Sequence, residues 1–189
     1  MDALLLSLFL CLIIDGLGGQ SLHAHHLLHH HGYSGASKAG IALALALYAG
    51  LAAAAGFYIS TLITPEARSL FFALALGLSA AGLLIPPKAA TSTEDSPSGG
   101  GFVASMVAML FGGIGGNAQF VIAGIAAARA DPWMAGLGGW LGSIAACLVL
   151  GGMLAGHRDM IGVKAARISG AIFLLAVAFF AAMAALRLV

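Results

Sequence analysis

Long apolar stretches dominate this sequence. Six of them follow one another, at residues 4–14, 41–63, 70–85, 102–128, 133–156 and 163–186. A membrane-spanning helix needs about 20 mostly apolar residues. Only 8% of the residues are charged and 61% are apolar, which lies outside the range of soluble domains. The sequence therefore predicts an all-α integral membrane protein with six transmembrane helices.

Composition also excludes several classes of protein. A net charge of +1 offers no basic stripe for nucleic acid. Cys11 and Cys147 lie inside apolar runs, which favours core packing over a disulfide framework. The N-terminus lacks the basic region of a signal peptide, so we expect it to form the first membrane helix. No nucleophile–base pair or closed metal site is visible, and we expect no enzymatic activity.

The two halves of the chain resemble each other. Gly16-Leu17-Gly18-Gly19-Gln20 aligns with Gly113-Ile114-Gly115-Gly116-Asn117 at an offset of 97 residues, and the same offset carries the third apolar run onto the sixth. We expect a first three-helix repeat at 1–87, a polar linker at 88–101 and a second repeat at 102–189. Because three crossings reverse the side of the membrane, such repeats insert with opposite orientations. The sequence predicts two inverted three-helix repeats.

Basic residues in the loops predict the topology. One side of the membrane would carry five of them: Lys38, Lys88, Arg158, Lys164 and Arg167. The other side would carry three: Arg68, Arg129 and Arg187. The positive-inside rule then places the 88–101 linker in the cytoplasm and both termini outside. We expect a multi-pass protein of an inner or plasma membrane.

The paired glycine motifs carry a likeness to a known family. The chain resembles the transmembrane protein 165 (Gdt) family of cation–proton antiporters, six-helix proteins whose halves each carry Glu-x-Gly-Asp-(Lys/Arg)-(Ser/Thr). The resemblance covers nearly the whole chain and is closest over 119–156, where Gly136–Gly142 and Leu150–Gly152 match the family's fifth helix. It implies exchange of Ca²⁺ or Mn²⁺ for protons, with the motif acids as ligands and proton carriers.

The acids of that motif are absent here. Gly16 and Gly113 stand at the Glu positions, and Gly19 and Gly116 stand at the Asp positions. A hard divalent ion prefers several carboxylate oxygens, and neutral residues cannot carry protons. The expected substrate pathway retains the shared glycines, neutral polar neighbours and one acid: Asp15, Gly16, Gly18, Gly19, Gln20, Ser21, Gly113, Gly115, Gly116, Asn117 and Gln119.

Two interpretations of the motif residues stay open. The glycines either break their helices so that free carbonyls line a cavity, or they allow close packing of helices through small residues. Asp15 lies inside a predicted span, one residue before the first lost Glu position. Intramembrane acids are functional by default, although a neutral, hydrogen-bonded Asp beside a helix break fits equally well.

A run of six histidines follows the first motif. His26 and His30, four residues apart on a helix, could share one metal ion, and with His23 and His29 they cover an arc that also contains Asp15. Imidazole suits Zn²⁺, Ni²⁺, Co²⁺ or Cu²⁺ better than Ca²⁺ or Mn²⁺, and it titrates near neutral pH. The alternative is a solvated helix end that binds metal without physiological meaning.

These observations lead to one function and one alternative. The first is a divergent membrane cation transporter that exchanges a divalent metal ion, Mn²⁺, Ca²⁺ or a softer metal, for protons. The alternative is a non-transporting membrane relative that binds a partner or stabilises a membrane complex. The expected partners are the lipid bilayer and the metal ion, and the sequence leaves the oligomeric state open.

Overall fold

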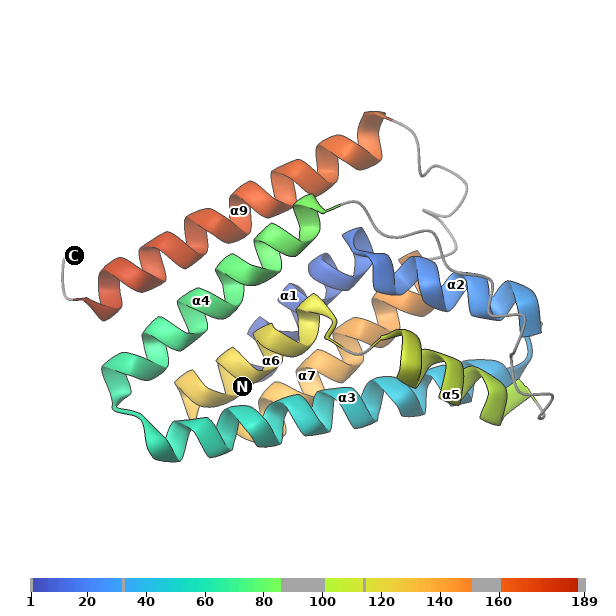
Figure 1. Cartoon of the computed structure of the whole chain (residues 1–189), viewed down its shortest axis with the longest axis horizontal. Helices are drawn as coiled ribbons and strands as arrows, with labels where there is room; N and C mark the ends of the chain where they lie inside the picture. Colours follow the sequence, from blue (N-terminus) through green and yellow to red (C-terminus); the bar gives the residue numbers. More distant parts are fainter. Residues whose placement is uncertain (1, 32, 86–100, 114, 151–160, 187–189) are drawn as a thin grey trace.

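The computed structural model describes residues 2–31, 33–85, 101–113, 115–150 and 161–186, and every regular element in these ranges is helical. Along the chain the elements are α1 (Asp2–Leu17), α2 (Gly19–His31), α3 (Gly35–Leu62), α4 (Pro65–Leu84), α5 (Gly101–Gly112), α6 (Asn117–Arg129), α7 (Pro132–Ala145), the π-helical turn η1 (Ala146–Leu150) and α9 (Ile161–Ala185). Figure 1 shows them as a bundle with α9 along one edge.

Three of these helices are long and apolar enough to cross a membrane: Gly35–Leu62, Pro65–Leu84 and Lys164–Ala185. Two bent pairs, α1 with α2 and α5 with α6, raise the number to five if each pair forms one span. Helix α7 and η1 cover 132–150 of the predicted fifth span, and the rest of that span lies outside the described residues. The described residues thus contain three to five candidate spans of a multi-pass membrane protein.

The sequence left open whether the two glycine motifs break their helices or pack them closely, and the structure has a break at both. Helix α1 passes Asp15 and Gly16 and ends at Leu17, where the chain bends by 65° into α2. The predicted span over 102–128 is divided into α5 and α6, which meet at 76°. Both bends fall at the glycine motifs, where glycine weakens the helix and permits a sharp kink.

Local signals in the sequence fix the starts of three other helices. Ser34, Thr64 and Asp131 each accept a hydrogen bond from a backbone N–H of the first turn of α3, α4 and α7. Proline opens α4 and α7, in a position where its missing N–H has no partner to lose. In the predicted 88–101 linker, Gly101 already belongs to α5, whereas 88–100 lie outside the described residues, as do Arg158 and Arg187 of the topology prediction.

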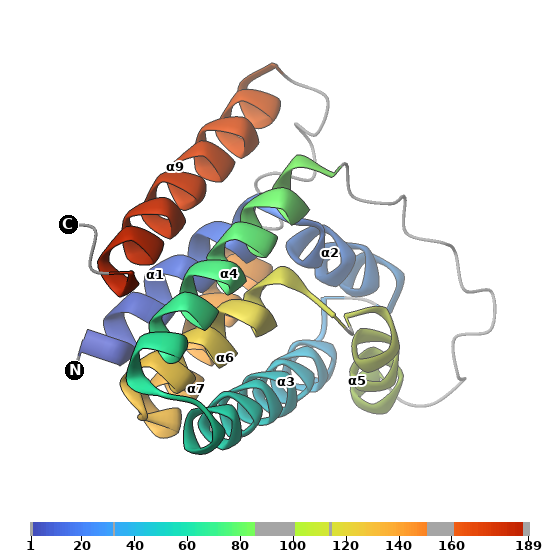
Figure 2. The ribbon, with the colours of Figure 1, turned by 60° about the vertical axis from the view of Figure 1, so that its left-hand side comes forward.

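Corresponding helices of the two halves begin at nearly the same offset along the chain. Helix α7 begins at Pro132, 97 residues after α3 begins at Gly35, and α9 begins at Ile161, 96 residues after α4 begins at Pro65. The contacts between the halves also correspond. Helix α1 of the first half packs on α7 of the second, and α5 of the second half packs on α3 of the first. Helices α4 and α9 pack side by side and run in opposite directions (Figures 1 and 2).

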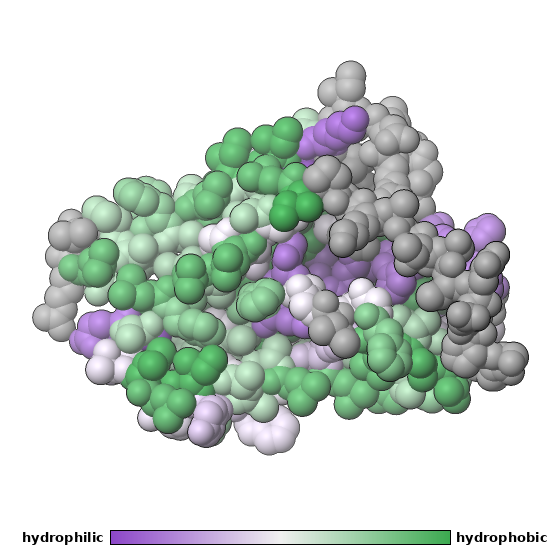
Figure 3. Space-filling model, in the orientation of Figure 1, coloured by the Kyte–Doolittle hydropathy of each residue, from purple (hydrophilic) through white to green (hydrophobic). Residues whose placement is uncertain are grey.

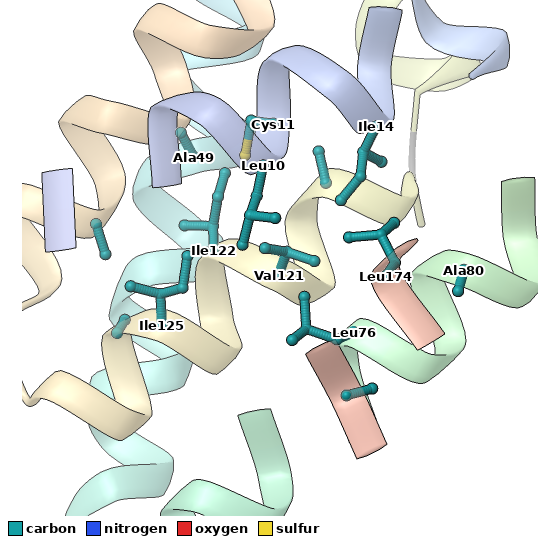
Figure 4. Close-up of a cluster of buried hydrophobic side chains, with 14 of the residues drawn as sticks. Leu10, Cys11, Ile14, Ala49, Leu76, Ala80, Val121, Ile122, Ile125 and Leu174 are labelled. Carbon is teal, nitrogen blue, oxygen red and sulfur yellow. The ribbon is translucent and has the colours of Figure 1, made fainter. Parts of the chain in front are cut away.

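Side chains from six helices fill the main core, part of which Figure 4 shows. Leu10, Cys11 and Ile14 of α1 meet Val121, Ile122 and Ile125 of α6, and Leu76 of α4 and Leu174 of α9 close the cluster. Cys147 belongs to a second buried cluster between α2, α3, α5 and η1. Both cysteines are buried and free, as core residues are expected to be.

The outward surface is apolar over much of the bundle. Figure 3 shows hydrophobic atoms over α9, α4 and α3, while hydrophilic atoms gather toward α2. On α9, large side chains such as Ile172, Phe179 and Phe180 are more than 60% exposed. A surface of this kind is costly in water and suits contact with lipid.

Candidate functional site

The first helix break is short, and its side-chain hydrogen bond comes from a nearby residue of the same segment. A single residue, Gly18, separates α1 from α2. Gly18 is buried, and a Cβ on it would lie only 2.5 Å from the Ile14 carbonyl oxygen, so no larger residue fits. The Ser21 hydroxyl lies 3.3 Å from the Gly16 carbonyl oxygen and 3.5 Å from that of Gly18, and it can donate its one proton to either of them. One carbonyl at the bend is therefore hydrogen-bonded from within the same segment.

The second break is wider and is held by a glutamine. Gly115 adopts a φ of +78°, a left-handed conformation that favours glycine, and Gly116 precedes the first turn of α6 without a side-chain cap. The Gln119 amide donates to the Gly113 carbonyl at 2.8 Å, and its Oε1 accepts from the Gly115 N–H at 3.2 Å. One side chain thus fixes both ends of the turn.

A tyrosine from another helix holds the end of α5. Tyr48 of α3 is 8% exposed, and its hydroxyl reaches the carbonyl oxygens of Met109, at 3.2 Å, and Leu110. Its ring lies over Gly113, where a Cβ would come within 2.9 Å of Tyr48 Cε2. Sequence reasoning missed Tyr48 because an isolated Tyr in an apolar run carries no pattern.

The two breaks meet through Gln20 and Gly116. A Cβ on Gly116 would lie 2.6 Å from Gln20 Oε1, 3.4 Å from the Gly113 carbonyl oxygen and 3.5 Å from Gln119 Nε2. Three polar atoms therefore surround the position of the missing side chain. Gln20 Oε1 is buried and has no hydrogen-bond partner among the described residues. The two motifs, 97 residues apart in the sequence, lie next to each other.

Asn117 occupies the equivalent of the Gln20 position in the second half but faces α4. Its carbonyl accepts a hydrogen bond of 2.9 Å from Ser79 Oγ of α4. The side-chain amide of Asn117 lies against Gly82, where a Cβ would overlap its atoms. The two amide residues at offset 97 therefore take different roles: Gln20 spans the two breaks, and Asn117 fastens α6 to α4.

Asp15 is buried one turn before the first break. It is 2% exposed, and the Ser143 hydroxyl of α7 donates to its Oδ2 at 2.5 Å. Ser143 comes from the opposite half of the chain, so this contact joins the two halves beside the break. Nothing in the sequence pattern singled out Ser143. An acid in this position can hold a proton or compensate a cation, and Ser143 orients it for either.

The structure divides the predicted histidine ligands between two environments. His23 is half-buried against α5, with its Nε2 3.5 Å from the Ala108 carbonyl oxygen and its ring on Gly112. His26, His29 and His30 are exposed. The expected shared arc with Asp15 was wrong, because the bend at Gly18 takes α2 out of line with α1.

No described side chains form a hard-cation cage. Where the chain is described, no group of three or more His, Cys, Asp or Glu side chains comes together in a way that could hold a metal ion. The meeting point of the breaks presents amide and backbone groups, with Asp15 held separately by Ser143. Such donors suit a weakly held ion or polar solute better than a tightly bound Ca²⁺.

Comparison with known proteins adds no further constraint. No family model, curated protein or solved structure matches this chain.

Proposed function

We propose that this protein is a divergent membrane cation transporter built as two inverted three-helix repeats, related to the transmembrane protein 165 (Gdt) family. The carrying observation is the meeting of two helix breaks from the two halves, at Gln20 and Gly116, beside the buried acid Asp15. Discontinuous helices that meet at a repeat interface are the arrangement used by secondary transporters. Divalent metals, exchanged for protons, are the proposed substrates.

The inverted arrangement is supported by packing and direction. The element bounds repeat at 96–97 residues, α1–α7 packing is mirrored by α5–α3 packing, and α4 runs opposite to α9 (Figure 2). A two-fold axis between the halves produces such a pair of contacts, because it maps the α1–α7 contact onto the α5–α3 contact. With an odd number of spans in each repeat, that axis lies in the membrane plane.

Asp15 is the proposed proton- and cation-coupling residue. It is a buried acid in a candidate span, and its partner Ser143 is neutral. A buried carboxylate without a compensating charge is costly in a bilayer. Asp15 therefore takes up either a proton or a cation, which is the exchange that an antiporter requires. The exposed His26 and His30 on α2 would collect a softer metal such as Zn²⁺ at the end of this route.

Flux into proteoliposomes tests this function. The full chain is reconstituted with a metal-sensitive dye inside, and Mn²⁺, Ca²⁺ and Zn²⁺ are added outside under an imposed pH gradient. We expect uptake of at least one metal that responds to the gradient and is lost in Asp15→Asn. Asp2→Asn is the matched control, because Asp2 carries the same group on the same helix but is exposed. Equal flux in wild type and Asp15→Asn would refute the role of Asp15.

The alternative is a non-transporting membrane protein that binds a partner. Two observations favour it: the motif acids are absent, and Ser21 and Tyr48 each hydrogen-bond a carbonyl at one of the breaks. Absence of uptake for all three metals, in a preparation whose folding is verified, would support this alternative over transport.

A further inference from the structure

A side chain from another helix donates a hydrogen bond to a carbonyl at the C-terminal end of α5. The last carbonyls of a helix lack partners within it, and in a membrane an unsatisfied carbonyl is costly because no water can reach it. The Met109 carbonyl already accepts the Gly113 N–H at 2.9 Å. The Tyr48 hydroxyl has a single proton to donate, so that proton is best used by the Leu110 carbonyl.

The two breaks differ in where this partner comes from. At the first break the donor is Ser21, whose hydroxyl lies within reach of the carbonyls three and five residues earlier in the chain. At the second break Tyr48 reaches Leu110 from 62 residues away, on another helix. The bond therefore exists only while α3 and α5 keep their present relative position. Gly113 completes the contact, because a side chain there would displace the Tyr48 ring.

We propose that Tyr48 is a gating residue that closes the second break to small monovalent cations. Its hydroxyl donates a hydrogen bond to the Leu110 carbonyl oxygen, and its ring covers Gly113. With Tyr48 displaced, the Leu110 carbonyl becomes a neutral oxygen donor. A second donor is Gln20 Oε1, which has no hydrogen-bond partner among the described residues. Neutral carbonyl rings coordinate K⁺-like ions in membrane pathways. This inference rests on the proposal that the breaks line a pathway.

Thallium flux tests the gate directly. Tl⁺, a probe for K⁺-like ions, is added to proteoliposomes that contain a Tl⁺-sensitive dye and the reconstituted full chain. Tyr48→Phe keeps the ring on Gly113 and removes the donor to Leu110. We expect Tl⁺ entry to rise by about tenfold over wild type, near the equivalent of one lost neutral hydrogen bond. Tyr58→Phe is the matched control, because Tyr58 lies on the same helix but is 66% exposed.

A second variant reaches the same gate from the other side. Gly113→Ala leaves the hydroxyl intact but places a Cβ 2.9 Å from the Tyr48 ring and 2.9 Å from the Met109 carbonyl oxygen, so it should raise Tl⁺ entry similarly. Because both changes open one contact, their combination should add little to either alone. Tl⁺ entry that stays at the wild-type and Tyr58→Phe level in Gly113→Ala, and in Tyr48→Phe where that variant folds, would overturn the proposal. The outcome is independent of metal uptake by wild type, so failure of the gate and failure of the proposed transport are distinguishable.

Discussion

The contact between α1 and α7 makes a sharp prediction about glycine. Gly138 and Gly142 lie four residues apart on α7, and each faces the backbone of α1. A Cβ on Gly142 would come closer to the Leu8 carbonyl oxygen than 3.0 Å, a limit that real Cβ atoms essentially never pass, and would lie 3.1 Å from the Leu12 nitrogen. Both atoms belong to the backbone, so no change of rotamer relieves the overlap. Helix α1 itself must move.

The expected cost follows from this geometry. Inserting a methyl group into a packed interior that must shift its backbone costs about 1–3 kcal/mol. Gly142→Ala should therefore lower the free energy of unfolding by about that amount, even though Ala favours a helix over Gly by about 1 kcal/mol at an unhindered site. Gly50→Ala is the matched control, because a Cβ on Gly50 of α3 meets no atom within 4 Å. That variant should be neutral or up to about 1 kcal/mol more stable.

Unfolding in mixed micelles measures the difference. The purified chain is titrated with a denaturing detergent, and the loss of structure is followed by the fluorescence of Trp140, whose indole N–H donates to the Ala42 carbonyl at 2.9 Å. The double variant Gly138→Ala with Gly142→Ala should lose less than the sum of the two single losses, because one displacement of α1 relieves both. Equal stability of Gly142→Ala and Gly50→Ala would refute the close packing of α1 on α7.

Two further predictions concern the histidines and the second break. Replacing His26 and His30 together by Ala should weaken Zn²⁺ binding in calorimetry far more than either single change, because the two side chains lie four residues apart on α2 and can share one ion. Equal small effects throughout would indicate a loose polyhistidine surface. Gly115→Ala should lower the free energy of unfolding by about 1–2 kcal/mol, because φ at Gly115 is +78° while a Cβ there meets no atom within 4 Å. Gly115→Asn should lower the free energy of unfolding by less, because Asn tolerates the left-handed conformation better than Ala. Equal losses of stability in the two variants would contradict a backbone origin.

The sequence predicted the long helices well and the breaks only in part. Apolar runs and the caps at Ser34, Thr64 and Asp131 are local features, and they define α3, α4 and the start of α7. The glycine motifs allowed either broken helices or close packing, and hydropathy alone could not separate these because the breaks contain no charged residue. Both motifs prove to be breaks.

Contacts that complete the candidate site could not be predicted from one sequence. Ser143 reaches Asp15 across 128 residues, and Tyr48 reaches Leu110 across 62. A lone Ser or Tyr in a membrane helix has no periodic signature, and its partner depends on how the helices pack. The division of the histidines has the same origin, because it depends on a bend at Gly18 that the residue spacing does not encode.

The described glycines differ in what they face. Gly40, Gly56 and Gly142 lie against backbone atoms of a neighbouring helix, so their role is close packing. Gly113 and Gly116 of the second motif also face side-chain atoms, of Tyr48 and Gln20, although a Cβ on Gly113 would in addition lie 2.9 Å from the Met109 carbonyl oxygen. A side chain can turn away at small cost, whereas a helix backbone cannot. Gly116, where a Cβ would lie nearest to Gln20 Oε1, is therefore the motif position where a larger residue changes the contents of the break at the least cost to the bundle, which is the property that a substrate pathway needs.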